Sequence, residues 1–203
     1  MSDAQTLALD TIRSEHRSLA LVINHLKALV AEAVAGRMAL DYSLCWSLVH
    51  YIDTFPDELH HPKEDEHFFK RVRVRTHDAD ALIDELMRQH THEEQALGQL
   101  RKWLGNCEAG VPAALQGLER TVKAYADFTW RHMRAEEHEL FPIAQAHLSA
   151  EDWAAIAQAF TSHDDPLSGQ SDAAAFNQLF HDIVRRTPAP LGLGPVSVAG
   201  KAP

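Results

Sequence analysis

The sequence predicts an all-α protein, an up-down-up-down four-helix bundle followed by one or two short C-terminal helices. Three observations lead to this fold class. Apolar residues recur at spacings of three and four over long stretches, no window alternates β-branched residues with a period of two, and only nine of the 203 residues are glycine. Four long helices joined by short loops pack most simply as antiparallel neighbours in one bundle.

Short polar or glycine-containing stretches separate the four long helices. Gly36 follows the first helix, and the segment from Asn106 to Pro112 makes the clearest loop, with Pro112 suited to the first turn of the last long helix. Pro56 and Pro62 should bend the second helix without ending it, because the apolar pattern resumes in register. The expected helices cover about residues 4–35, 38–73, 77–105 and 112–147.

The chain is expected to divide into three parts: the bundle at residues 1–148, a helical C-terminal extension at 149–186, and a flexible tail at 187–203. Ser149 and Asp152 resemble a capping box that opens a short helix over about 150–161. Residues 163–169 are expected to form a loop, and a second short helix is expected over about 172–186. The tail is rich in proline and glycine, which disfavours regular structure.

Composition and charge limit the classes of function. Hydrophobic residues make up 45% of the chain and charged residues 24%, which is typical of a soluble globular protein. The formal net charge of −10 offers no basic surface, so we expect neither nucleic acid nor a membrane as a partner. Cys45 and Cys107 form no CxxC pair, which argues against a disulfide framework and a thiolate zinc site. The first residues lack a signal-peptide pattern, so the expected location is the cytoplasm.

Fourteen histidines are more than such a composition usually contains, and four of them interrupt the apolar stripes of the four long helices. Counted from the expected helix ends, each of the four lies roughly 20 Å from the same end of the bundle, at 1.5 Å per residue. The four imidazoles are therefore expected to converge on one interior layer. They belong to His16, His60, His90 and His132.

Three of these histidines are followed four residues later by a carboxylate, which an α-helix stacks on the same face. The acids are Glu64, Glu94 and Glu136. A carboxylate facing a core is costly unless it is paired or bound to a metal ion. Imidazole and carboxylate without thiolate suit iron or manganese, with zinc possible. Seven such side chains exceed one tetrahedral zinc site and predict two metal ions that share carboxylates, so the predicted bundle has a metal site in its core.

Neighbouring residues leave alternatives open. His61 could replace His60 as a ligand if Pro62 distorts the backbone, and Glu93 and Glu137 compete with their neighbours, although surface solvation is the expected role of both. A ferritin-like arrangement of Glu-x-x-His on two helices is disfavoured, because only Glu64 and His67 fit it. Tyr125 lies two turns before His132 on the same face and could donate a hydrogen bond to a bound ligand. The histidines expected to be solvated or capping are His25, His50, His92, His138 and His147.

These residues resemble the hemerythrin-like (HHE cation-binding) family over about residues 8–146. The matching features are Glu15-His16, His60 with Glu64, His90, and His132 with Glu136, and the segments HHPKEDEHFF and HMRAEEHELFP are similar to the family's signatures for its second and fourth helices. The resemblance implies a four-helix bundle that holds two iron ions bridged by Glu64 and Glu136, with manganese or zinc as less favoured metals. It also implies an open iron position for dioxygen or a similar small molecule.

The sequence departs from the oxygen-carrying members at one position. Those proteins have a second histidine one turn after the third-helix ligand, and this chain has Glu94 there, with Glu93 beside it. A carboxylate in place of imidazole lowers the positive charge of the site and should favour ferric iron. The expected function is therefore a non-haem di-iron protein that binds dioxygen or senses oxygen, iron or redox state. The alternatives are an enzyme that handles peroxide, nitric oxide or iron oxidation and storage, and a structural metal-stabilised interaction bundle.

Overall fold

The computed structural model describes residues 3–161 together with 178, 181–182 and 185–186. Within these residues the chain is helical and contains no strand, which confirms the all-α prediction. The elements are α1 (Asp3–Val34), α2 (Tyr42–Phe55), η1 (Pro56–His60), α3 (His61–Lys63), η2 (Glu64–Phe69), α4 (Lys70–Arg75), α5 (Asp80–Glu108), α6 (Ala114–Ala135), η3 (Glu136–Leu140), α7 (Phe141–His147) and α8 (Ala150–Thr161).

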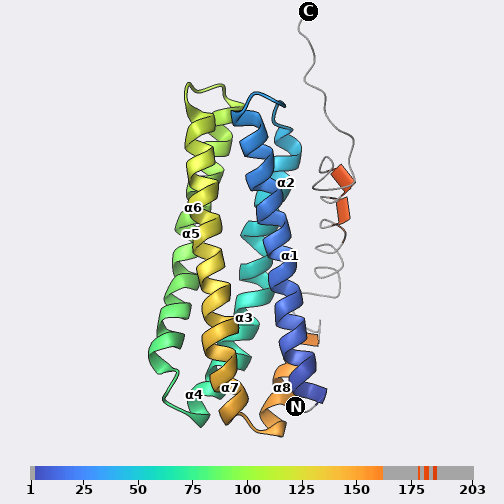
Figure 1. Cartoon of the computed structure of the whole chain (residues 1–203), viewed down its shortest axis with the longest axis vertical. Coiled ribbons are helices and arrows are strands. Elements are labelled where there is room, and N and C mark those ends of the chain that lie inside the picture. The colour runs from blue at the N-terminus through green and yellow to red at the C-terminus, as the bar shows by residue number, and fades with distance from the viewer. Residues whose placement is uncertain (1–2, 162–177, 179–180, 183–184, 187–203) are drawn as a thin grey trace, which may run out of the picture.

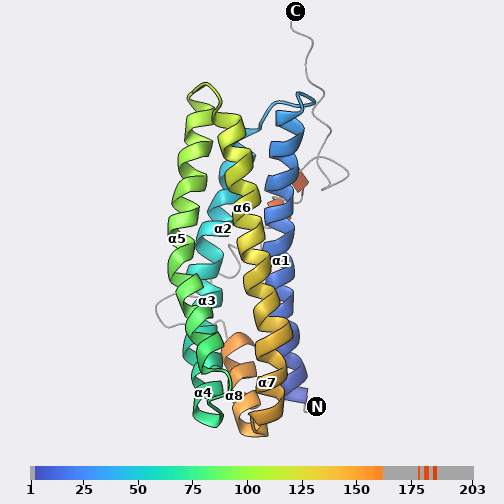
Figure 2. The ribbon, with the colours of Figure 1, turned by 60° about the vertical axis from the view of Figure 1, so that its left-hand side comes forward.

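Four long helical segments run side by side along the long axis of the molecule (Figures 1 and 2). They are α1, the run from α2 to α4, α5, and the run from α6 to α7. Helix α1 packs against α2 and α6, and α5 packs against the same two helices, so each segment has two long neighbours. The short helix α8 packs against α1 near its N-terminal end and against η2. Among the described residues, every helix is too short or too polar to cross a bilayer.

Side-chain caps fix two helix starts. The Leu44 amide donates to the Asp41 carboxylate at 2.9 Å, so α2 begins at Tyr42 rather than near residue 38 as predicted. The predicted capping box is present at α8, because the Ser149 amide donates to the Asp152 carboxylate and the Asp152 amide donates to the Ser149 hydroxyl. The predicted helix over about 150–161 is therefore confirmed by α8.

The predicted loop between the third and fourth long helices is shorter than expected. Helix α5 continues to Glu108, which places Gly105 and Asn106 inside the helix. Helix α6 begins at Ala114, so Pro112 precedes the helix and does not occupy its first turn. The predictions for residues 163–169 and 187–203, and most of the helix predicted at 172–186, lie outside the described residues.

Three π-helical segments, in which hydrogen bonds run from i to i+5, interrupt two of the long segments. Two of them, η1 and η2, lie on either side of α3 in the second long segment, and η3 lies between α6 and α7. Pro56 begins η1 and Pro62 lies in α3, so the backbone changes its winding at the two prolines and the segment continues. Such segments occur often at functional sites, and each of these three contains or adjoins a predicted metal ligand.

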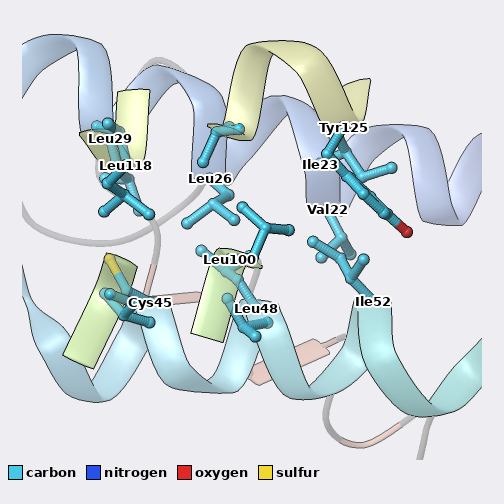
Figure 3. Packing of buried hydrophobic residues seen from close by; sticks show 14 of the residues in the cluster. Val22, Ile23, Leu26, Leu29, Cys45, Leu48, Ile52, Leu100, Leu118 and Tyr125 are labelled. Atoms are coloured by element: carbon cyan, nitrogen blue, oxygen red, sulfur yellow. The ribbon is translucent and has the colours of Figure 1, made fainter. Parts of the chain in front are cut away.

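The interior contains two separate apolar clusters. The larger one joins α1, α2, α5 and α6, and the residues labelled in Figure 3 run from Leu29 and Cys45 at one end to Ile52 and Tyr125 at the other. The smaller one joins the N-terminal part of α1 to η2, α5, α7 and α8 and includes Phe68 and Trp153. Along α1, Ile12 belongs to the smaller cluster and Leu19 to the larger. The residues between these two on α1, 13–18, are all polar.

Candidate metal centre

Seven of the buried polar side chains in the layer between the two clusters are candidate metal ligands, and they come from all four long segments. They form two groups whose candidate ligand atoms lie within 4.8 Å of one another. Site 1 consists of His16, His60, Glu64 and Glu136, and site 2 consists of His61, Glu64, His90 and His132. Glu64 therefore belongs to both sites. Glu136 also faces both, because its carboxylate lies 3.1 Å from His16 Nε2 and 3.5 Å from His132 Nε2.

Six of the seven side chains predicted from the sequence come together in this layer, and Glu94 does not. The Glu94 side chain is exposed, whereas that of Glu93 is only 4% exposed. The inward positions of α5 alternate spacings of four and three, as Leu86, His90, Glu93 and Leu97 show. The expectation that Glu94 faces the metal layer is therefore wrong. It assumed that the acid follows its histidine by four residues, as in the other two pairs, but on α5 the inward-facing residue after His90 is Glu93.

Two adjacent histidines both face the interior, one for each site. His60 is 2% exposed and His61 is 6% exposed, with ring centroids 5.7 Å apart. In a regular α-helix consecutive side chains point about 100° apart, but here η1 ends at His60 and α3 begins at His61. The sequence interpretation treated the two as competitors for one position. The signal that could have revealed both is the position of the pair between Pro56 and Pro62.

Each of the four predicted histidines directs Nδ1 to an acceptor and Nε2 to the interior. A carboxylate oxygen or the oxygen of a side-chain amide can only accept, so each Nδ1 carries the proton and donates it, which leaves Nε2 available as a ligand. The Nδ1–acceptor distances are 2.8 Å for His16 and Glu137, 2.8 Å for His60 and Glu15, 3.1 Å for His90 and Asp65, and 3.0 Å for His132 and Gln89.

Basic side chains support the two carboxylates behind site 1. Lys63 Nζ lies 3.3 Å from Glu15 Oε1, and Arg13 Nε lies 3.9 Å from Glu137 Oε2. Burial opposes ionisation of Glu15, but its hydrogen bond with His60 and the nearby Lys63 keep its pKa below the usual value. Both carboxylates are therefore ionised and orient their imidazoles. On site 2, the Gln89 amide nitrogen donates to Glu85 at 2.7 Å, which leaves the amide oxygen to accept from His132.

The two shared acids are fully buried and titrate in opposite directions. Burial, and then the charge of Glu136, raise the pKa of Glu64 well above its usual value. Burial also acts against the ionisation of Glu136, but His132 and His16 outweigh it and lower its pKa to about 2. Of the two carboxyl groups, that of Glu64 therefore binds a proton more readily, and a cation at this position would compete with that proton.

The pKa values of the histidines are also shifted in opposite directions. Burial opposes the charged form of His16, yet the carboxylates of Glu136 and Glu137 beside its ring raise its pKa to about 9. Burial lowers the pKa of His132 to about 4, and burial together with His90 lowers that of His61 well below the usual value. At neutral pH His61 and His132 are therefore neutral, which is the form that binds metal ions.

Several buried atoms in the layer are arranged as a cation would require. Both carboxylate oxygens of Glu64 and of Glu136 lack a hydrogen-bond partner among the described residues, and so does His16 Nε2. His90 Nε2 and His132 Nε2 lie 3.1 Å apart, although the neutral form of each ring has its proton on Nδ1. Two lone pairs at that distance repel each other, and a metal ion accepts both. The donor set therefore fits metal ions better than it fits a metal-free core.

The comparison with known families agrees with this geometry. The sequence profile of the family described as "Hemerythrin HHE cation binding domain" matches residues 7–144. The chain belongs to this family. Among curated proteins, none matches the chain. The matched residues include every member of site 1 and site 2, and the description of the family names cation binding.

Proposed function

We propose that this hemerythrin-family chain is an up-down-up-down four-helix bundle that holds two iron ions and that binds dioxygen or senses oxygen, iron or redox state. In this proposal sites 1 and 2 each hold one ion, and Glu64 and Glu136 bridge them. The observation that carries the proposal is the position of Glu64, whose buried carboxylate belongs to both groups of candidate ligands. Carboxylates that span two imidazole-lined positions are typical of centres with two metal ions.

The donor set supports iron over other metals. The two sites offer five imidazoles and two shared carboxylates, and both cysteines lie in the larger apolar cluster. Imidazole and carboxylate oxygen together suit iron and manganese, whereas zinc and copper(I) sites more often contain thiolate. Iron would supply a reversible change of oxidation state and a position open to a small oxidant.

The chain's own residues prepare the site in two ways. The four carboxylate or amide acceptors fix the imidazole rings with Nε2 inward, which reduces the ordering needed when a metal ion binds. The apolar clusters on both sides of the layer restrict access of bulk water, and the lower local dielectric strengthens each ligand interaction. The hydroxyl of Tyr125, which the sequence suggested as a hydrogen-bond donor to a bound ligand, donates to Glu93.

An enzymatic use of the same centre is the second candidate, and the buried Glu93 favours it. A third carboxylate in the layer lowers the net positive charge of a loaded site and stabilises ferric iron. Ferric stability disfavours reversible dioxygen carriage and favours reactions with peroxide or nitric oxide, or the oxidation of iron.

Elemental analysis of aerobically purified protein, with visible spectra before and after reduction and re-exposure to air, tests the proposal. About two irons per chain with an oxygen-dependent near-ultraviolet band support dioxygen binding or sensing. Two irons that oxidise once and stay ferric favour the enzymatic candidate. Zinc, or no metal at all, contradicts the proposal and favours a structural bundle.

Ligand variants give the second test. His60→Ala and Glu136→Ala should each lose at least one iron, because each removes a candidate ligand of site 1. Glu94→Gln is the matched control. The Glu94 side chain is exposed on α5, so its substitution should leave the iron content unchanged. Full iron occupancy in both ligand variants would refute the assignment.

A further inference from the structure

Glu93 is a buried carboxylate beside site 2 that belongs to neither group of candidate ligands. It lies on α5, one turn after His90, and one carboxylate oxygen is 3.5 Å from His61 Nε2. Its other oxygen accepts a hydrogen bond from the Tyr125 hydroxyl. A buried carboxylate is costly in an apolar environment, so its place beside the imidazole of His61 needs a physical reason.

The two sites differ in their nitrogen ligands when Glu93 is left out. Both sites face the carboxylates of Glu64 and Glu136, but site 1 has two imidazoles and site 2 has three. A nitrogen-rich set of that kind suits zinc, copper and nickel as well as iron. One additional anionic oxygen would shift the preference of site 2 toward harder ions such as iron and manganese.

Tyr125 holds the Glu93 side chain in the orientation that faces site 2. Tyr125 lies at the end of the larger apolar cluster nearest Ile52 (Figure 3), and its side chain is buried. Its hydroxyl binds Oε1 of Glu93, and Oε2 is the oxygen that faces His61. The phenol therefore positions the carboxylate without neutralising its charge.

We propose that Glu93 determines the metal specificity of site 2, as an anionic oxygen donor that favours iron and manganese over zinc, and that Tyr125 positions it. This inference rests on the proposed function, because it requires that both sites bind metal ions. It concerns only the choice among metals, so the two proposals can fail separately.

The test measures the affinity of metal-free protein for Fe(II) under anaerobic conditions, for Mn(II) and for Zn(II). The variants are Glu93→Gln, which keeps an acceptor for Tyr125, and Glu94→Gln as the exposed control one residue away. In Glu93→Gln the affinity of one of the two positions, site 2, for Fe(II) and Mn(II) should fall about 10- to 100-fold. Its affinity for Zn(II) should change far less, and Glu94→Gln should match the wild type for all three metals.

Tyr125→Phe provides a second variant that keeps the carboxylate charge and removes only the hydrogen bond. Its preference for Fe(II) over Zn(II) should fall in the same direction as that of Glu93→Gln, by a smaller factor. Circular dichroism of the metal-free variants shows whether each has folded. If folded Glu93→Gln has the same ratio of Fe(II) to Zn(II) affinity as the wild type, the inference is overturned and the proposed function stands. A wild-type protein that binds none of the three metals overturns both.

Discussion

Replacing Glu64 by glutamine should have opposite effects on the metal-free and the metal-loaded protein. In the metal-free protein, burial and the facing Glu136 make the ionised Glu64 unfavourable, so its pKa lies well above 4.5. A glutamine of nearly the same shape carries no charge and removes that cost. In the loaded protein the same substitution removes a ligand that belongs to both sites.

The magnitude for the metal-free protein follows from proton linkage. The folded state binds the Glu64 proton more tightly than the unfolded state, so this group's contribution to stability is present below pH 4.5 and is lost as the pH rises toward the folded-state pKa. The loss is about 1.4 kcal/mol per pH unit across that window. The free energy of unfolding of Glu64→Gln, relative to that of the wild type, should therefore increase by about 1.4 kcal/mol for each pH unit in this window.

The metal-loaded protein should show the reverse order of stability. A ligand that binds only the folded state stabilises it by about 2.7 kcal/mol at a free concentration one hundred times its Kd. Glu64→Gln should lose most of this increment at both sites, because each site loses one of its four candidate ligands.

Urea unfolding followed by far-ultraviolet circular dichroism measures both effects between pH 5 and 8. Each protein is unfolded once with a chelator and once with excess metal. Glu94→Gln serves as the control, because its exposed side chain should change neither curve. A metal-free Glu64→Gln protein that is less stable than wild type at pH 8, or one that keeps the full metal stabilisation, would refute the reasoning.

Two further predictions follow from the same structure. Metal binding at pH 7 should release at least one proton per chain, that of His16, whose pKa is about 9; calorimetry in buffers of different ionisation enthalpy measures this, and a buffer-independent enthalpy would contradict it. Gly117→Ala should destabilise the protein by about 1 to 3 kcal/mol, because the added Cβ would overlap the Trp103 ring. Gly98→Ala, where nothing lies within 4 Å of the added Cβ, should gain up to about 1 kcal/mol in helix propensity, and thermal unfolding separates the two results.

Local sequence patterns were sufficient for the helices and for most of the candidate site. The stripe that contains Leu9, Ile12 and His16 has helical spacing whatever it packs against, and α1 is a helix from Asp3 to Val34. His60 with Glu64 and His132 with Glu136 share a face through their i,i+4 spacing, and all four side chains are buried. These features depend on backbone periodicity, which the sequence encodes directly.

Contacts between distant segments could not be predicted in this way. We expected a solvated or capping role for His25, yet packing of the surrounding helices leaves it 1% exposed. Glu137 was expected at the surface, and it accepts the Nδ1 proton of His16, which is 121 residues earlier in the chain. Side chains on the margin of an apolar stripe are assigned to core or surface by the neighbouring helix, and the sequence of one helix does not contain that information.

The sequence by itself determined an all-helical chain with histidines and carboxylates at one level of the bundle. Only the tertiary structure decided that His61 joins His60, that Glu93 rather than Glu94 faces the interior, and that Glu64 belongs to both sites. The physical reason is that these choices depend on small rotations of each helix about its axis. A rotation of a few tens of degrees exchanges adjacent residues between core and solvent, and it is fixed by the π-helical segments and by packing against the other three helices.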